Sequence, residues 1–125
     1  MSGATELTKI LSSLSPKVLP DSYVFCTLPE ARYGDYAEVH PIASFQEQEG
    51  LTLVLTKARA EALDWTYDSL FNCISLQVHS SLTSVGLTAA VAAKLAASEI
   101  SVNMIAGYYH DHLFVPQEQA REAMD

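Results

Sequence analysis

The stretch from Ser80 to Ile105, SSLTSVGLTAAVAAKLAASEISVNMI, decides how this chain folds. Ser and Thr residues lead up to a glycine, after which the pattern predicts a helix from about Gly86 to Ser98. Leu87, Val91 and Leu95 form one apolar stripe on this helix, and its many alanines let it lie close on a sheet. The stretch therefore predicts a loop, a helix and then the start of a strand.

The segments on either side continue this pattern. Ile74, Leu76 and Val78 alternate with polar residues, as expected for a half-buried strand. The expected segments are a strand at Leu70–His79, a strand at Ile100–Gly107, a turn at Tyr109–His112, a return strand at Leu113–Val115 and a last helix from Pro116.

The first half contains similar elements without a long central helix. Glu49-Gly50 lies between two strand-like runs and is typical of a hairpin connection. The expected segments are an amphipathic helix at Leu7–Leu14, a strand at Tyr23–Leu28, a loop at Pro29–His40, hairpin strands at Ile42–Gln48 and Leu51–Leu55, and a helix at Lys57–Leu63.

A weak internal repeat relates the two halves. An offset of 61 residues places Val54 on Val115, whereas the first strands align best at an offset of 47, which places Cys26 on Cys73. The offsets differ by 14 residues, about the length of the Gly86–Ser98 helix. The first half is therefore expected to resemble the second with that helix replaced by the Pro29–His40 loop.

This order predicts an α+β chain of two ferredoxin-like (βαββαβ) units in tandem, with an antiparallel sheet and helices on one face. We expect a degenerate unit at residues 1–66, which lacks its first helix, and a regular unit at residues 67–125. The second unit lacks a strand after its last helix, so either the chain is cut short there or a strand from elsewhere completes the sheet.

Composition limits the classes of partner. Fifteen acidic residues oppose seven basic ones, the net charge is −8, and no basic cluster occurs, which argues against nucleic acid and anionic membranes as partners. No run is long and apolar enough for a transmembrane helix, and the N-terminus lacks the features of a secretory signal. We therefore expect a cytoplasmic location, in which Cys26 and Cys73 are buried reduced thiols rather than a disulfide or a nucleophile.

Four stretches together resemble the ACT domain family: YVFCTLPEA, FQEQEGLTLVL, HSSLTSVGLTAAVAAKL and AGYYHDHLFVP. They resemble in particular small ACT-type proteins that join a degenerate N-terminal unit to a regular one. The resemblance implies regulatory binding of an amino acid at the loop between the first strand and the first helix, often at an interface between units. Where the family loop has Asp and Pro this chain has Thr83 and Val85, which leaves the ligand's identity open. Asn103 resembles the Asn of aspartokinase-type ACT units, whose strand faces the effector.

The residues themselves support such a site. Gly86 lets a ligand approach the backbone, and the unpaired amides of the first helical turn suit a carboxylate. Asn103 adds an acceptor and two donors that could pair with either end of an amino acid. Alternatively, Gly86 only starts a helix and Asn103 satisfies nearby backbone groups. The candidate ligand-binding residues are Ser81, Thr83, Ser84, Val85, Gly86, Leu87, Asn103, Met104 and Ile105.

The sequence gives little support for catalysis or for metal binding. On a strand, His110 and His112 could both reach one metal ion but Asp111 could not, and two ligands do not make a metal site. The HDH sequence is therefore interpreted as a polar turn. The alternative is that this turn caps a partner or a ligand. Ser80, Ser81 and Cys73 lie near His79, but no nucleophile motif surrounds them, and no phosphate-binding loop is present. We expect no catalytic residues, no metal and no cofactor.

The sequence thus predicts a non-catalytic regulatory module that binds an amino acid or similar metabolite and forms a homodimer. The alternative is a structural or protein-interaction module that assembles through its sheets without a ligand. An unrecognised enzyme is a third hypothesis.

Overall fold

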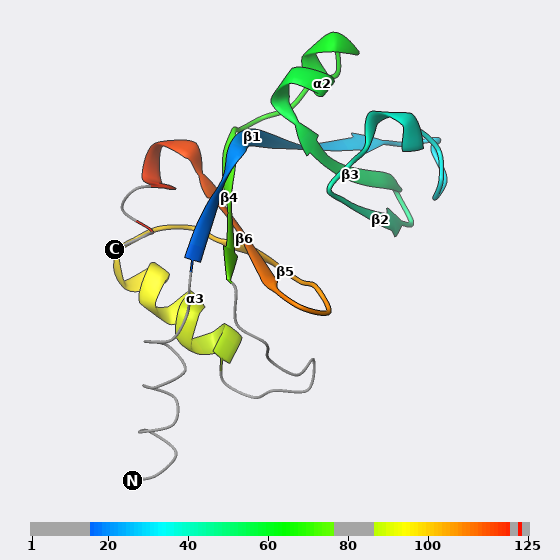
Figure 1. Ribbon diagram of the computed structural model, residues 1–125. Coiled ribbons are helices and arrows are strands. Elements are labelled where there is room, and N and C mark those ends of the chain that lie inside the picture. The colour runs from blue at the N-terminus through cyan, green and yellow to red at the C-terminus, as the bar shows by residue number, and fades with distance from the viewer. Residues whose placement is uncertain (1–15, 77–86, 121–122, 124–125) are drawn as a thin grey trace, which may run out of the picture. The chain divides into compact units, whose positions relative to one another are not determined.

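This computed structural model describes residues 16–76, 87–120 and 123 of the chain (Figure 1). The chain divides into two compact units, which we name by their content. The loop unit comprises residues 21–71, and the helix unit comprises residues 1–20 together with 72–125. The predicted helix at Leu7–Leu14 and the predicted loop at Ser80–Gly86 lie outside the described residues.

In the described part of the chain, six strands are hydrogen-bonded in the order β2-β3-β1-β4-β6-β5. The strand β1 (Pro16–Leu28) contributes its first five residues to the helix unit and the rest to the loop unit. No helix among the described residues is long and apolar enough to cross a membrane.

The loop unit contains a three-stranded antiparallel arrangement. Its hairpin consists of β2 (Ala43–Glu47) and β3 (Gly50–Thr56), and the short 3-10 helix η1 (Ala37–Val39) precedes it. β3 pairs with β1, with Cys26 opposite Leu53, and with β2, with Phe45 opposite Thr52. The hairpin predicted around Glu49-Gly50 is therefore confirmed.

Alternation along these strands builds the core of the loop unit. Alternate residues of β3 and of the C-terminal part of β1 are buried in one cluster, because neighbouring residues on a strand point to opposite faces. The cluster's buried members are Val24, Cys26, Ala31, Val39, Leu51, Leu53, Leu55 and Ala60.

The helix α2 (Lys57–Ala62) follows β3 directly because Thr56 caps it. The Thr56 hydroxyl oxygen accepts a hydrogen bond from the Arg59 amide at 3.3 Å, which satisfies one of the donors at the helix start. The helix ends where Asp64 adopts a left-handed conformation and the Trp65 amide donates to the Ala60 carbonyl at 3.0 Å. The predicted helix at Lys57–Leu63 is confirmed to within one residue.

The helix unit has the same internal strand order as the loop unit. In the loop unit β1 neighbours β3, which neighbours β2; in the helix unit β4 neighbours β6, which neighbours β5. The elements are β4 (Phe71–Leu76), the helix α3 (Leu87–Ala97), β5 (Asn103–Ala106), β6 (Asp111–Pro116) and the 3-10 helix η2 (Gln117–Gln119).

The predicted stripe of α3 packs into the core of the helix unit. Val91 and Leu95 are buried in a cluster with Ile74, Leu76, Ile100, Leu113 and Val115. The helix ends with Glu99 in the left-handed conformation, while the Ile100 amide donates to the Leu95 carbonyl at 3.0 Å. Leu95 and Ile100 also share the core cluster, so packing and hydrogen bonding end the helix together.

The predicted turn at Tyr109–His112 is placed two residues too late. The turn spans Gly107 to His110, closed by a hydrogen bond of 2.9 Å from the Gly107 amide to the His110 carbonyl. Asp111 and His112 already belong to β6, where they pair with Ala106 and Ile105. Glycine suits the first turn position because a Cβ atom on Gly107 would lie only 2.8 Å from the His110 carbonyl oxygen.

Candidate functional site

Four of the nine predicted ligand-binding residues lie among the described residues: Leu87, Asn103, Met104 and Ile105. Leu87 is the first residue of α3. The other five, from Ser81 to Gly86, lie outside the described residues.

The three strand residues of the predicted site start β5, which is the last strand in the sheet order. Met104 is half-buried against the cluster that contains the α3 stripe, so its side chain lies on the α3 face of the strand. Asn103 and Ile105 therefore point to the opposite face. Asn103 is exposed there, opposite Phe114 of β6.

This alternation restricts how a ligand could meet both parts of the predicted site. An edge strand leaves alternate amides and carbonyls of its backbone unpaired on its outer side. A ligand beside β5 could contact those groups and the start of α3 on one face, and the Asn103 amide from the other face. The structure thus places Met104 on the α3 face of β5 and Asn103 on the opposite face.

The tip of the β5–β6 hairpin carries the two histidines of the HDH sequence. Nδ1 of His112 is buried and has no hydrogen-bond partner among the described residues. Burial lowers the pKa of His112, and the neighbouring His110 lowers it further, while Asp111 opposes both effects. A Cβ atom on Gly107 would lie 3.3 Å from Nε2 of His112, so the ring packs closely against the turn.

The described residues include no group of three or more His, Cys, Asp or Glu side chains placed to hold a metal ion. The cysteines are free and buried, as predicted. Burial raises the pKa of the Cys73 thiol to about 11 and also raises the pKa of Cys26. Neither cysteine is therefore a thiolate near neutral pH, and neither is suited to nucleophilic catalysis.

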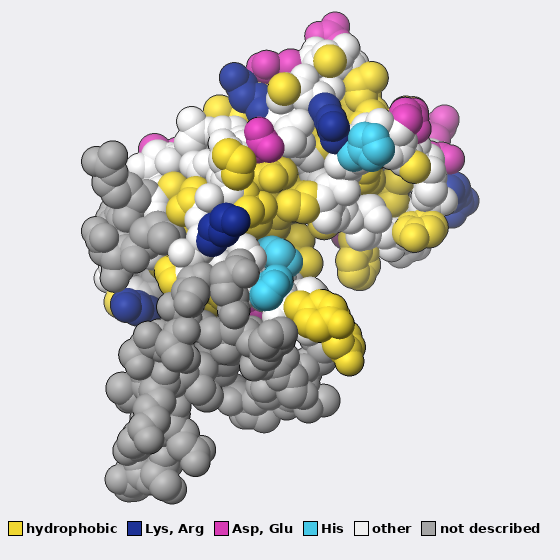
Figure 2. All heavy atoms as spheres, viewed as in Figure 1, with side chains coloured by type: hydrophobic (Ala, Val, Ile, Leu, Met, Phe, Trp, Pro, Cys, Tyr) yellow, Lys and Arg dark blue, Asp and Glu magenta, His cyan; other side chains and the backbone are white. Residues whose placement is uncertain are grey.

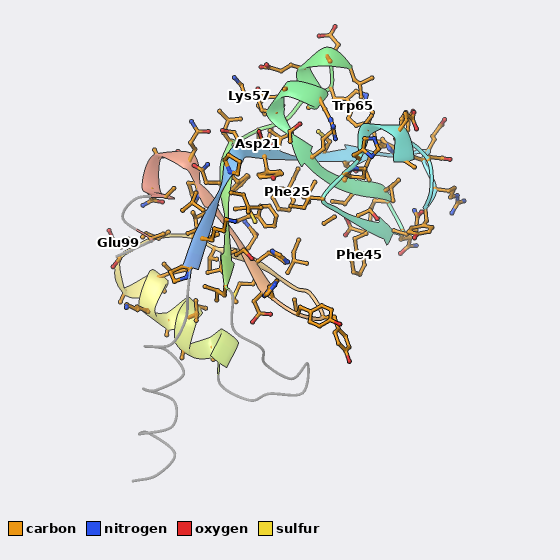
Figure 3. The ribbon with its side chains drawn as sticks, in the orientation of Figure 1. Asp21, Phe25, Phe45, Lys57, Trp65 and Glu99 are labelled. Carbon is orange, nitrogen blue, oxygen red and sulfur yellow. The ribbon has the colours of Figure 1, made fainter. Side chains whose placement is uncertain are left out.

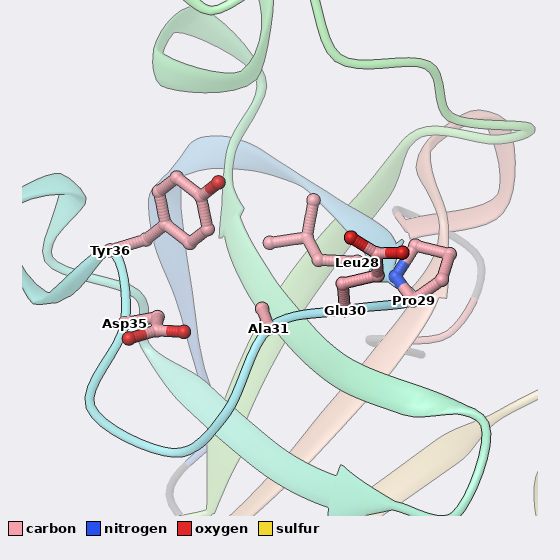
Figure 4. A pocket seen from close by; sticks show the side chains of 6 residues that line it. All are labelled: Leu28, Pro29, Glu30, Ala31, Asp35 and Tyr36. Carbon is pink, nitrogen blue, oxygen red and sulfur yellow. The ribbon is translucent and has the colours of Figure 1, made fainter.

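The loop unit contains a surface pocket that sequence reasoning missed. The pocket has a volume of about 480 Å³ and is lined by Leu28, Pro29, Glu30, Ala31, Asp35 and Tyr36 (Figure 4). Asp35 and Tyr36 lie at one end, Pro29 and Glu30 lie at the other, and Ala31 lies between them. A second hollow of about 380 Å³ lies beside it and shares Asp35.

Long-range hydrogen bonds hold the loop that forms this pocket. Nη1 of Arg59 donates to the Val39 carbonyl at 2.8 Å and to the His40 carbonyl at 3.4 Å. The Gln46 side chain accepts from the Tyr33 amide at 2.7 Å, and Asp35 accepts from the Arg32 amide at 2.9 Å. Arg59 and Gln46 lie 13 to 20 residues from these backbone partners, so no local pattern in the sequence indicates how they hold the loop.

Figure 2 shows lysine and arginine side chains scattered singly over the described part of the face in view. A phosphate backbone or an anionic membrane would require several such charges close together.

The geometry defines a two-unit α+β chain of the ACT type, and comparison with known families agrees. Two ACT domain family models match in tandem, one over residues 2–72 and the other over residues 69–125. The chain belongs to the ACT domain family. This membership supports a regulatory module.

Several solved structures are similar to the chain. A Vibrio cholerae protein of unknown function, described as a possible transport protein, is 51% identical, with a TM-score of 0.88 over 99% of this chain and 94% of that one. An Agrobacterium tumefaciens protein is 19% identical, with a TM-score of 0.73 over 90% of this chain and 84% of that one.

The regulatory subunit of aspartate kinase from Thermus thermophilus is 13% identical, with a TM-score of 0.58 over 90% of this chain and 95% of that one. At such identities the likeness extends to the fold alone. No curated protein matches the chain.

Proposed function

We propose that the chain is a non-catalytic regulatory module that binds an amino acid or a similar small metabolite in the helix unit. The ligand lies between the start of α3 and the edge strand β5. The observation that carries the proposal is Asn103, an exposed amide at the first position of an edge strand in a chain of the ACT family.

The chemistry of the two elements complements an α-amino acid. The first amides of α3 have no partners within the helix and lie at the positive end of its dipole, which suits a carboxylate. The outer carbonyl groups of β5 can accept hydrogen bonds from an ammonium group. The Asn103 side chain can both donate and accept, so it can add a contact from the opposite face.

The burial and protonation of the potentially reactive side chains support binding without catalysis. Both thiols are buried and protonated near neutral pH. His112 is packed into the hairpin turn rather than placed beside a nucleophile among the described residues.

The proposal also covers the location of the protein, its oligomeric state and the boundaries of its two units. We expect a cytoplasmic homodimer in which a degenerate unit at residues 1–66 precedes the ligand-binding unit at residues 67–125. Nucleic acid and membranes are not expected as partners. A module that assembles through its sheets and binds no metabolite remains the competing function.

A thermal-shift screen against the twenty standard amino acids tests the proposal. A ligand at a hundred times its dissociation constant should stabilise the protein by about 2.7 kcal/mol, which is easily measured. If no amino acid raises the unfolding temperature, the interaction module becomes the better reading.

The site itself is tested with Asn103→Leu once a ligand is found. Loss of a hydrogen bond to a charged group should weaken binding by about 1.5–3 kcal/mol, or more than tenfold. Ser101→Leu is the matched control, because Ser101 is exposed two residues before Asn103 and is not part of the site. If calorimetry shows that Asn103→Leu binds the ligand as tightly as Ser101→Leu does, the ligand binds elsewhere.

A further inference from the structure

The pocket of about 480 Å³ in the loop unit has an apolar middle and a carboxylate at each end. Leu28 and Ala31 line the middle, while Asp35 lies at one end and Glu30 at the other (Figure 4). No lysine or arginine is among its lining residues. A ligand that complements these walls has an apolar body with a positive charge at each end.

Both carboxylates are available to such a ligand. Oδ2 of Asp35 accepts a hydrogen bond of 2.9 Å from the Arg32 amide, which orients the side chain and leaves Oδ1 for another donor. Among the described residues, neither Glu30 nor Asp35 forms an ion pair with a basic side chain. A cationic ligand would therefore supply a counter-charge that the described part of the chain does not.

Tyr36 adds an aromatic wall at the Asp35 end of the pocket. Its ring contacts the ring of Trp65 edge to face, with centroids 5.1 Å apart and an interplanar angle of 88°. Figure 3 shows Trp65, which packs against the core of the loop unit. Tyr36 is 39% exposed, so part of its ring can face a ligand. The face of a tyrosine ring attracts an ammonium group, as the neighbouring carboxylate does.

The two ends of the pocket are held in place before a ligand arrives. The Ala31 amide donates to the Leu28 carbonyl at 3.1 Å and closes the turn that contains Glu30. The Asp35 amide donates to the Arg32 carbonyl at 2.9 Å and closes a second turn. Because both turns are closed, binding does not have to order the backbone that carries the carboxylates.

We propose that this pocket binds a small aliphatic diamine, which is an alkane with an ammonium group at each end. One ammonium group pairs with Asp35 beside the Tyr36 ring, and the other pairs with Glu30. The alkane chain lies on the apolar middle of the pocket. The carboxylate of an amino acid would be repelled by both acidic side chains, so this ligand differs in class from the one proposed for the helix unit. The inference goes beyond the proposed function and does not depend on it.

Isothermal titration calorimetry at low salt tests the proposal. The probes are diaminopropane, diaminobutane and diaminopentane, with butylamine as the singly charged control. At about pH 7.5 their amino groups are charged, as the lysine side chain is. One of the diamines should bind about fivefold more tightly than butylamine, which is the effect of a second ion pair at an exposed site. If no diamine binds more tightly than butylamine, the proposal is wrong.

Three variants, each with one negative charge fewer, locate the diamine. Asp35→Asn and Glu30→Gln should each bind the diamine no more tightly than butylamine, because one of the two charge pairs is lost. Asp35→Asn keeps an oxygen that can accept from the Arg32 amide. Asp68→Asn is the matched control and should keep the preference, because Asp68 is exposed in the same unit and does not line the pocket. Equal losses in all three variants would show that net charge attracts the diamine, and the proposed site would be wrong.

Trp65 fluorescence gives a second measure of where the diamine binds, because Trp65 is the only tryptophan and contacts Tyr36. Saturating diamine should change its emission in the wild-type chain and in Asp68→Asn. An unchanged spectrum at saturation would place the diamine away from Tyr36 and overturn the proposal.

Asn103→Leu separates this pocket from the site proposed in the helix unit. The variant should bind the diamine as tightly as the wild-type chain does. If Asn103→Leu weakens diamine binding and Asp35→Asn does not, the diamine binds in the helix unit and this proposal fails. If the diamine binds as expected while no amino acid raises the unfolding temperature, the proposed function fails and the diamine site stands.

Discussion

Gly50 is the position in the loop unit where a single added carbon atom should be most costly. It begins β3 with a φ of 150° and is buried. A Cβ atom there would lie 2.7 Å from the Leu28 carbonyl oxygen and 2.7 Å from the Pro29 Cα. Both are backbone atoms of a neighbouring segment, so neither can rotate aside as a side chain would.

The expected cost of Gly50→Ala has two parts. A non-glycine residue in such a backbone conformation costs about 1–3 kcal/mol. Overpacking against fixed backbone adds about 1–3 kcal/mol. Gly34→Ala is the matched control, because Gly34 has a φ of 98° but nothing lies within 4 Å of its added Cβ. The control therefore carries the first cost alone.

Urea unfolding measured through Trp65 fluorescence gives the comparison. Trp65 is the only tryptophan and packs against the core of the loop unit, so its signal reports on that unit. Gly50→Ala should lower the free energy of unfolding by about 1–3 kcal/mol more than Gly34→Ala does. Equal losses in the two variants would show that the close approach of Leu28 and Pro29 to Gly50 has no energetic consequence, and the argument would fail.

Two further predictions concern buried titratable groups. Cys26 and Cys73 should react with a thiol reagent at about pH 8 far more slowly in the folded protein than in urea, since burial raises their pKa values; rapid labelling of the folded protein would contradict their burial. The pKa of His112 is lowered from 6.5, so the unfolded chain binds a proton more readily, and stability should fall as the pH decreases below about 6.5. Urea midpoints followed by circular dichroism should show this dependence reduced in His112→Gln; an unchanged dependence would exclude His112 as its source.

Regular elements were predictable because their signals are local. The apolar stripe of Val91 and Leu95 predicted α3, and both residues are buried in its core cluster. Alternation and the Glu49-Gly50 connection predicted the β2–β3 hairpin. In α3 and β3 the side chains that indicate the element are also the ones that it buries, so pattern and packing agree.

The predicted strand at Tyr23–Leu28 begins seven residues too late, because β1 extends back to Pro16. Pro20 and Asp21 indicated a break, since proline cannot donate to a strand ladder. The chain remains extended through Pro20, and β1 passes at that residue from the helix unit to the loop unit. The proline therefore marks a boundary between units rather than the end of a strand.

The pocket of the loop unit could not be predicted, because its shape depends on distant partners. Arg59 and Gln46 fix the loop through hydrogen bonds to backbone groups at residues 31–40. Tyr36 and His40 adopt left-handed conformations, and the bulky Tyr36 is of a residue type that rarely does so. The only local signal was the Gly34-Asp35 pair, which indicates a turn and carries no information about what the turn encloses.

The two units differ in the segment that connects their matching strands, and this difference argues that they do not bind the same ligand. They share one strand order, but the helix unit has α3 where the loop unit has an irregular segment. The start of α3 offers backbone amides and a positive dipole end, which attract a carboxylate. The pocket of the loop unit presents the carboxylates of Glu30 and Asp35, with no lysine or arginine among its lining residues, and it repels a carboxylate. Replacing a helix start by an acidic loop therefore removes from one unit the feature that the proposed amino-acid site requires in the other.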